Sequence, residues 1–250
     1  MNQFPHPIAP EALPAPPPGA IHTWRFPLDL PESVQPGLRA LLDDTERARA
    51  DRFYRRIHGD RFTAARATLR RVLAACTGVP PVAIRFGVQA RGKPYLIAPE
   101  SDIRFNLSHS GDQGIIAVAR GIEVGVDIEG IRENDSLPKI ARRYFAPPEY
   151  EALQGLPESD REAAFYQCWT AKEALIKAWG LGLHAPLDRF AVEVAPGRTR
   201  LCAMDIPGFD PAAWDVQAVS AGAGFAAALA WEGPEVTIVS RCLDPSLRPM

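Results

Sequence analysis

The order of strand-forming and helix-forming segments constrains this fold most, because the same order occurs twice along the chain. Each time, a strand candidate is followed by helical segments and then by further strand candidates, as judged by residue periodicity. The first series comprises strand 21–30, helices 36–54 and 58–78, and strand candidates between 83 and 120. The second comprises strand 122–129, helices 137–144, 148–153 and 159–179, and five strand candidates between 188 and 243. This order indicates an α+β fold of two similar lobes.

Three segments are expected from this order: a Pro-rich arm at 1–20, an N-terminal lobe at 21–121 and a C-terminal lobe at 122–250. The arm is rich in Pro and Ala, which is typical of an extended and poorly ordered chain. A tight connection at Arg120 and Gly121 indicates a β-hairpin between the strands on either side. The last five strand candidates alternate as an antiparallel meander does.

Composition is that of a soluble globular protein and excludes several function classes. A net charge of −2 over 250 residues excludes a generally basic nucleic-acid-binding protein. No apolar run reaches the ~18 residues that cross a bilayer, and the N-terminal sequence lacks the basic start and apolar core of a signal peptide. Four scattered cysteines suit free thiols in a reducing compartment. We therefore expect a cytoplasmic protein with no nucleic-acid or membrane partner.

Basic residues are concentrated between positions 47 and 71. Only Asp51 and Asp60 oppose nine arginines there, namely Arg47, Arg49, Arg52, Arg55, Arg56, Arg61, Arg66, Arg70 and Arg71. The guanidinium fork matches phosphate oxygens, so the cluster is a candidate site for a small polyanion. A solvated helix face is the alternative, and the residues alone leave both interpretations open.

Two acidic residues share one face of the predicted strand at 122–129. Side chains alternate along a strand, so Asp127 and Glu129 lie next to each other, opposite the apolar residues of the segment. Two carboxylates at this spacing repel unless a cation or a shared proton relieves them. A third carboxylate from another element would complete an all-oxygen site suited to Mg²⁺. A solvated strand edge is the simpler alternative.

The predicted helix at 159–179 carries a second group of candidate residues, in the stretch CWTAKEALIKAWG. Gly180 is expected to end this helix. Glu173 and Lys177 share a narrow polar wedge, whereas Lys172 intrudes into the apolar arc. A surface ion pair stabilising the helix by ~0.2–0.5 kcal/mol is one explanation of Glu173 and Lys177. A site that holds Glu173 for a chemical purpose is the other.

Three further motifs, RGKPYL, FNLSHSGD and FAPPEYEAL, are weak in isolation. A turn explains Lys93, and capping of backbone groups explains His109. Together with GVDIE and CWTAKEALIKAWGLGL, however, these motifs occur in the order and approximate spacing of the 4'-phosphopantetheinyl transferases. Over residues 47–192 the chain resembles the larger, monomeric type, which activates peptide synthetases and related carrier proteins. The resemblance implies a pseudo-twofold arrangement of the lobes, with coenzyme A bound between them.

The resemblance also implies roles for individual residues. The Mg²⁺ ligands fall on Asp127, Glu129 and Glu173. The catalytic residues fall on Asp127, Glu173 and Lys177, with Glu173 as general base as well as ligand. The implied coenzyme A contacts are Arg49, Arg61, Lys93, Ser108, His109 and Lys177. The implied reaction moves the 4'-phosphopantetheine arm of coenzyme A to a serine of an apo acyl or peptidyl carrier protein and releases 3',5'-ADP.

Carrier proteins of this kind are usually acidic, so an apolar patch edged by arginine is the expected docking surface. The segment 131–145 has this character, and its residues pack a helix onto the core in the alternative interpretation. Position 46 is Glu where some relatives have a basic residue, which leaves the N-terminal phosphate contacts open. Two other functions remain as alternatives: a different Mg²⁺-dependent enzyme that cleaves phosphate esters, and a non-catalytic module that binds coenzyme A or a carrier.

Overall fold

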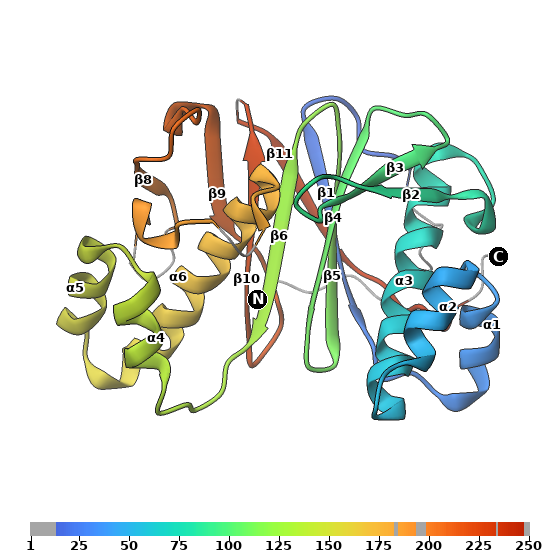
Figure 1. The fold of residues 1–250 in the computed structure, drawn as a ribbon, viewed down its shortest axis with the longest axis horizontal. Helices are drawn as coiled ribbons and strands as arrows, with labels where there is room; N and C mark the ends of the chain where they lie inside the picture. The colour runs from blue at the N-terminus through green and yellow to red at the C-terminus, as the bar shows by residue number, and fades with distance from the viewer. Residues whose placement is uncertain (1–13, 183–184, 194–198, 234, 248–250) are drawn as a thin grey trace. The chain divides into compact units, whose positions relative to one another are not determined.

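The computed structural model describes residues 14–182, 185–193, 199–233 and 235–247 (Figure 1). Residues 1–13 of the expected arm lie outside this part of the chain. The chain divides into two compact units. The first comprises Met1–Val88, Pro94–Gly121 and Val236–Met250, and the second comprises Gln89–Lys93 and Ile122–Glu235.

A four-stranded sheet in the order β11-β1-β5-β4 is central to the first unit. Its strands are β1 (Ala20–Pro27), β4 (Ile103–Ser110), β5 (Gln113–Arg120) and β11 (Thr237–Cys242). Strand β1 pairs antiparallel with β5 and parallel with β11. Strands β4 and β5 form a hairpin whose turn contains Gly111 at a φ of 57°, a conformation that glycine adopts without strain. A separate antiparallel pair consists of β2 (Arg85–Val88) and β3 (Pro94–Ala98).

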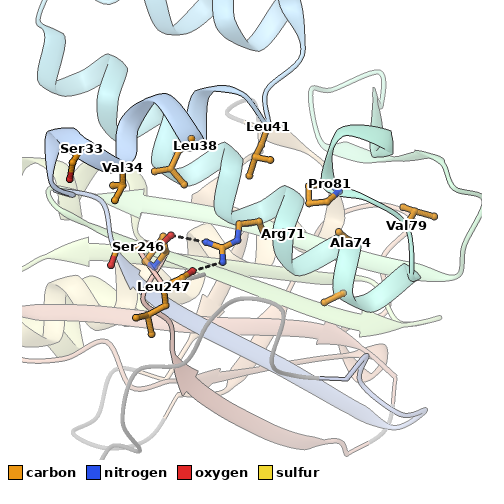
Figure 2. Close-up of a pocket in the computed structure, with 13 residues that line it drawn as sticks. Ser33, Val34, Leu38, Leu41, Arg71, Ala74, Val79, Pro81, Ser246 and Leu247 are labelled. Carbon is orange, nitrogen blue, oxygen red and sulfur yellow. Dashed lines mark hydrogen bonds between the residues drawn. The ribbon is translucent and has the colours of Figure 1, made fainter. Parts of the chain in front are cut away.

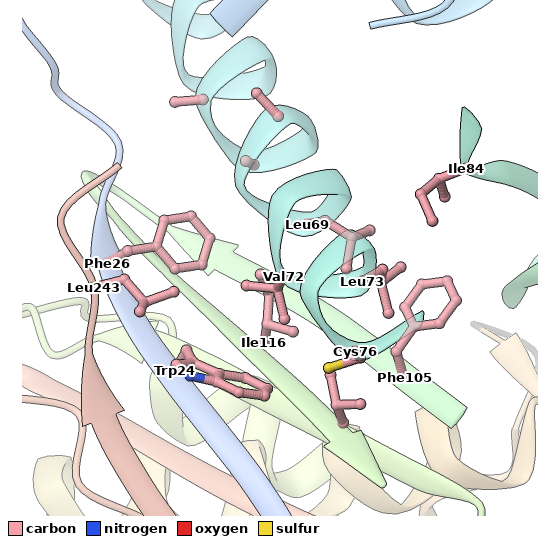
Figure 3. Packing of buried hydrophobic residues seen from close by; sticks show 14 of the residues in the cluster. Trp24, Phe26, Leu69, Val72, Leu73, Cys76, Ile84, Phe105, Ile116 and Leu243 are labelled. Carbon is pink, nitrogen blue, oxygen red and sulfur yellow. The ribbon is translucent and has the colours of Figure 1, made fainter. Parts of the chain in front are cut away.

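Helices cover one face of this sheet. They are α1 (Gln35–Arg39), α2 (Asp44–Asp51) and α3 (Arg56–Thr77), with 3-10 turns at Glu32–Val34 and Pro81–Ala83. Leu69 and Leu73 of α3 pack with Trp24 of β1 and Phe105 of β4 in one buried cluster (Figure 3). Gly78 ends α3 in the left-handed conformation, as expected from the sequence.

The second unit is built around a three-stranded antiparallel sheet in the order β6-β10-β9. Its strands are β6 (Val124–Gly130), β9 (Trp214–Ala218) and β10 (Phe225–Glu232), and a short pair consists of β7 (Phe190–Val192) and β8 (Leu201–Met204). Its helices are α4 (Leu137–Tyr144), α5 (Pro147–Gly155) and α6 (Glu158–Trp179), with 3-10 turns at Leu187–Arg189 and Pro211–Ala213. Helix α6 packs along the sheet, and their side chains share the buried cluster of this unit (Figure 1).

Both units have the same connectivity. In each, a first strand is followed by helices, by a short antiparallel pair and by two strands of which the last pairs with the first. The resulting orders are β1-β5-β4 and β6-β10-β9. Each unit therefore has helices packed on a mostly antiparallel sheet, and the expected α+β fold class is confirmed.

Several expectations about strand pairing are wrong. Strand β5 pairs with β1 and β4, and β6 pairs with β10, so no hairpin connects β5 to β6 at Arg120 and Gly121 in the described chain. The last five strands belong to three sheets instead of one meander. Residues 236–250, expected in the C-terminal lobe, belong to the first unit because β11 pairs with β1. Alternation identifies the faces of a strand and says nothing about which strand pairs with it.

The helix expected at 36–54 is interrupted. Asp43 accepts a hydrogen bond from the backbone of Glu46, and Glu46 accepts one from the backbone of Asp43, so a capping box starts α2 there.

No helix in the described part of the chain is both long enough and apolar enough to cross a membrane.

Candidate active site on α6 and β6

A close approach between α6 and β6 creates the candidate site. A Cβ atom on Gly125 of β6 would lie 2.1 Å from the carbonyl oxygen of Ala174 and 2.3 Å from the amide nitrogen of Ala178. Only glycine therefore allows the helix backbone this close to the strand. On the neighbouring strand β10, small Ala228 and Ala230 face the helix as well. The sequence thus favours a helix lying almost directly on the sheet.

Strand alternation then directs the two acidic residues toward the helix. Asp127 and Glu129 lie two and four residues after Gly125 on β6, so their side chains leave the strand on the face that α6 covers. Asp127 is 3% exposed, and Glu129 is half-buried. The predicted pairing of these carboxylates on one face is therefore found, and it lies under the helix instead of at a solvated edge.

Helix α6 supplies the other two candidate residues at the same place. The Lys177 ammonium donates a hydrogen bond of 2.5 Å to Asp127 Oδ1, and this ion pair links the helix to the strand. Burial, and then the charges of Asp127 and Glu129, raise the pKa of Glu173 to about 7, although Lys177 acts in the opposite direction. The structure therefore brings together Asp127, Glu129, Glu173 and Lys177.

These residues suit a hard cation by their chemistry. Three carboxylates provide only oxygen donors, which is the ligand type that Mg²⁺ prefers. Burial and, after it, the neighbouring carboxylates raise the pKa of Glu173, and a bound cation would offset the repulsion among the carboxylates. Within the described chain, no group of three or more His, Cys, Asp or Glu side chains is already arranged to hold a metal ion. In this arrangement a cation, the Lys177 ammonium, already contacts Asp127.

Lys172, which the sequence left unexplained, is an internal ion-pair partner. Its ammonium is fully buried and contacts both carboxylate oxygens of Glu149 at 2.8 and 2.7 Å and the carbonyl oxygen of Phe190 at 2.6 Å. Glu149 also accepts hydrogen bonds from the backbone amides of Ala146 and Val192. Lys172 is therefore enclosed within the second unit and does not reach solvent. The ion pair connects α6 to α5 and β7, and it fixes the turn of helix that contains Glu173.

Glu149 was not recognised as an important residue from the sequence. A local signal was present, because Pro147 and Pro148 begin a helix whose third residue is Glu, and such a glutamate can reach back to the N-cap amide. This local signal predicts the bond of Glu149 to the Ala146 amide. It gives no information on the ion pair of Glu149 with Lys172, which lies 23 positions later.

Lys93 lies in the second unit, where it contacts two protein groups. Its ammonium donates to Glu123 at 2.7 Å and to the carbonyl oxygen of Ala178 at 2.9 Å. The side chain is only 7% exposed.

Ser108 and His109 belong to β4 of the first unit and lie on opposite faces of that strand, because they are consecutive. Ser108 is buried and His109 is exposed. Both residues pair with β5, so the strand continues through them to Ser110. They therefore do not form a side-by-side pair on one face of the sheet.

Most of the arginine cluster is engaged within the first unit. Arg66 and Arg70 both pair with buried Glu46 at 2.6 and 2.7 Å. This ion-pair group explains the acidic residue at position 46, which holds α2 onto α3. Of the two predicted phosphate contacts, Arg61 forks onto Asp29 at 2.6 and 2.7 Å, and exposed Arg49 lies over the ring of Phe62.

A cavity of about 620 Å³ in the first unit is lined by none of the predicted coenzyme A contacts (Figure 2). It lies between α1, α3 and the C-terminal segment. Arg71 donates hydrogen bonds of 2.6 Å to the carbonyl oxygens of Pro245 and Leu247 at its edge. Arg71 therefore holds the C-terminal segment and is not a solvated member of the basic cluster.

Helix α4 in the segment 131–145 uses its apolar face for packing. Leu137, Ala141 and Phe145 are buried in the cluster beneath α6. The exposed residues of α4 include Lys139, Arg142, Arg143 and Tyr144, and Arg143 lies over the ring of Tyr144. The three buried residues are therefore not available for docking, whereas exposed Tyr144 and half-buried Ile140 are, and the docking surface on this segment stays a prediction.

Comparisons with known proteins agree with these motifs. A model of the 4'-phosphopantetheinyl transferase superfamily matches residues 123–230, and a model of the 4'-phosphopantetheinyl transferase N-terminal domain matches residues 35–120. The 4'-phosphopantetheinyl transferase HetI of Nostoc sp. is 42% identical over 178 residues, which cover 70% of this chain and 75% of that protein. The 4'-phosphopantetheinyl transferase Sfp of Bacillus subtilis is 31% identical over 169 residues, covering 67% and 74%.

A solved structure, that of Thermotoga maritima holo-[acyl-carrier-protein] synthase, matches with a TM-score of 0.37 and 23% identity. The match covers 44% of this chain and 62% of that one.

Proposed function

Because the chain belongs to the 4'-phosphopantetheinyl transferase superfamily, we propose that it transfers the 4'-phosphopantetheine arm of coenzyme A to a serine of an apo acyl or peptidyl carrier protein. The second product is 3',5'-ADP. The observation that supports this most is the meeting of Asp127, Glu173 and Lys177 where α6 lies on β6. Carboxylates and an ammonium at one point suit phosphoryl transfer to a hydroxyl group.

Glu173 acts as the general base in this proposal. In the metal-free protein, a pKa of about 7 makes this carboxyl group a better proton acceptor near neutral pH than an ordinary glutamate. A cation held by the same carboxylates would lower this pKa. The serine oxygen attacks the phosphorus that carries the pantetheine arm, and its proton passes to Glu173. The bond between that phosphorus and the oxygen of 3',5'-ADP breaks. Atoms and charges then balance without any other reactant.

Lys177 contacts the phosphates and offsets the negative charge that gathers on the leaving group. Asp127 holds the Lys177 ammonium at the strand, so this charge is positioned before the substrate arrives. Asp127, Glu129 and Glu173 would hold Mg²⁺. When bound, this ion would neutralise charge on the pyrophosphate of coenzyme A.

Residues of the first unit are assigned to the remaining phosphates of coenzyme A. Arg49 is exposed and lies over the ring of Phe62, and the guanidinium of Arg61 is already paired with the carboxylate of Asp29. Ser108 and His109 contribute a hydroxyl group and an imidazole. The basic face of α4, with Arg142 and Arg143, receives the acidic carrier protein. All four cysteines are free thiols, which supports a reducing cytoplasm, and we expect a monomer.

Intact mass spectrometry on a panel of apo carrier proteins tests the proposal. With coenzyme A and Mg²⁺, we expect at least one carrier to gain the mass of one phosphopantetheine arm. The Asp127→Ala variant should fold and should lose this activity by at least about a hundredfold, because the lysine and the metal both lose a partner.

Two results would contradict the proposal. Release of inorganic phosphate without any carrier protein would favour a phosphate-ester hydrolase that uses the same carboxylates. Tight binding of coenzyme A or carrier with no modification of any carrier would favour a non-catalytic module. Wild-type turnover by Asp127→Ala at saturating Mg²⁺ would contradict the metal assignment alone.

A further inference from the structure

We propose that Lys93 is a positioning residue: the turn Gln89–Lys93 holds the C-terminal end of α6 and thereby keeps Lys177 in place. The proposal rests on the proposed function of Lys177 and replaces the expected contact between Lys93 and coenzyme A. It concerns residues of the second unit only, because Gln89–Lys93 belongs to that unit together with α6.

The first observation is that the charge of Lys93 is already used. Its ammonium contacts Glu123 at 2.7 Å and the Ala178 carbonyl oxygen at 2.9 Å. Only 7% of the side chain is exposed to solvent. The Ala178 carbonyl belongs to the last turn of α6, where carbonyl groups lack partners within the helix and where a cation is favourable. A phosphate approaching Lys93 would meet the carboxylate of Glu123.

The second observation is a close backbone fit after the helix. A Cβ atom on Gly180 would lie 2.9 Å from the side-chain oxygen of Gln89, and one on Gly182 would lie 2.9 Å from the carbonyl oxygen of Arg91. Both glycines have positive φ angles of 67° and 65°. The stretch Gly180–Gly182 is therefore shaped to receive the turn, independently of the ion pair.

The turn itself is closed by its own hydrogen bonds. The amide of Gln89 donates to the carbonyl oxygen of Lys93 at 2.9 Å, and the amide of Gly92 donates to that of Gln89 at 2.9 Å. Because these hydrogen bonds restrict the backbone of the turn, Lys93 stays in a fixed position relative to the end of α6.

Lys93 affects the candidate site because the residue that it holds is the neighbour of Lys177 in the sequence. Lys177 directly precedes Ala178, whose carbonyl group Lys93 holds, and the Lys177 ammonium extends to Asp127. If the last turn of α6 frays, the backbone that carries Lys177 moves. Lys93 and Glu123 thus act on the phosphate contact through Lys177, without touching the substrate.

Two single variants, Lys93→Met and Glu123→Gln, separate this role from phosphate binding. We expect each to lower kcat about tenfold and to change the KM for coenzyme A less than about twofold, because a displaced Lys177 loses contacts in the transition state. The double variant should be no slower than the slower single variant, because both changes remove the same interaction. Arg91→Met, which removes an exposed cation of the same turn, is the matched control and should leave kcat unchanged.

Opposite effects of the two variants would overturn the proposal. A raised KM in Lys93→Met with an unchanged or lowered KM in Glu123→Gln would make Lys93 a phosphate contact that Glu123 opposes. Equal losses in Lys93→Met and Arg91→Met would overturn it as well, since they would reflect charge alone.

Hydrogen exchange judges the proposal without any measurement of activity. Amides from Ile176 to Leu181 should exchange at least about fivefold faster in both variants than in the wild type, because the last turn of α6 opens more often. Unchanged exchange would overturn the positioning role. If the wild type modified no carrier protein, the proposed function would fail, and these exchange rates would still decide whether the turn holds the helix.

Discussion

Ionisation of Glu173 works against the folded state, because this carboxyl group is buried beside Asp127 and Glu129. Burial and these two charges raise its pKa from 4.5 to about 7. The folded protein therefore binds this proton more tightly than the unfolded chain does. The resulting stabilisation is complete below about pH 4.5 and is lost as the pH rises through about 7. The residue best suited to act as a base at neutral pH thus also costs stability there.

Replacing this residue should therefore stabilise the protein in the absence of metal. We expect Glu173→Gln to match the wild type near pH 4.5 and to be more stable by about 1–3 kcal/mol near pH 8. Urea unfolding at both pH values in the presence of a chelator measures the difference. Exposed Glu151→Gln on α5 is the control and should unfold like the wild type at both values. If the free energy of unfolding changed equally between the two pH values in the wild type and in Glu173→Gln, the raised pKa of Glu173 would be contradicted.

At the scale of elements, α6 is fixed at several points along its length. Lys172 ties its middle to α5 and β7, Gly125 lets it lie against β6, and Gly180 ends it in a left-handed residue. Glu173 lies next to Lys172 and one turn before Lys177, so it is held between these points. The orientation of the candidate site is therefore a property of how the helix is anchored.

Breaking the internal ion pair should destabilise this element strongly. Lys172→Met leaves the buried Glu149 charge without its partner, and we expect a loss of about 3–5 kcal/mol in the free energy of unfolding. Adding Glu149→Gln removes that charge and should recover about half of the loss, although the amides of Ala146 and Val192 lose part of their acceptor. Chemical denaturation measures both values.

Exposed Lys139→Met is the matched control, and its stability should lie within about 0.5 kcal/mol of the wild type. A similarly small effect of Lys172→Met would mean that the buried pair contributes nothing net. Equal losses in the single and double variants would mean that the uncompensated charge is not the cause.

At the scale of the whole molecule, the two compact units are interleaved in sequence. The chain forms most of the first unit, then the second, and then returns to add β11 beside β1. Arg71 of α3 secures this returning segment through the carbonyl groups of Pro245 and Leu247. The last residues therefore contribute to the stability of a unit that begins more than two hundred positions earlier, as the pairing of Ala20 with Thr237 illustrates.

Loss of this connection should loosen the C-terminal segment. Arg71→Met removes the donors for two carbonyl groups, and we expect a loss of about 1–3 kcal/mol in the free energy of unfolding. Carboxypeptidase should also remove C-terminal residues faster than from the wild type. Exposed Arg55→Met is the control. Digestion at the wild-type rate in Arg71→Met would show that other contacts hold the segment.

Local signals explain which features could be predicted from the sequence. Gly78 and Gly180 end α3 and α6 as expected, and strand alternation places Asp127 and Glu129 on one face. These features depend on neighbours within a few residues. The parallel pairing of β11 with β1 and the partner of Lys172 depend on contacts between distant segments, for which a single sequence carries no periodic signal.

The distribution of lysine has a practical consequence for handling the protein. The chain has 28 basic residues, of which only Lys93, Lys139, Lys172 and Lys177 are lysines. Lys172 and Lys177 belong to α6 and Lys93 contacts its last turn, and the side-chain exposures of Lys93, Lys172 and Lys177 are 7%, 0% and 27%. Amine-reactive dyes and resins will therefore react first at Lys139 on α4 among the lysines. Immobilisation by this chemistry would attach the protein through the basic face proposed for carrier binding, so thiol coupling at exposed Cys202 is the better choice.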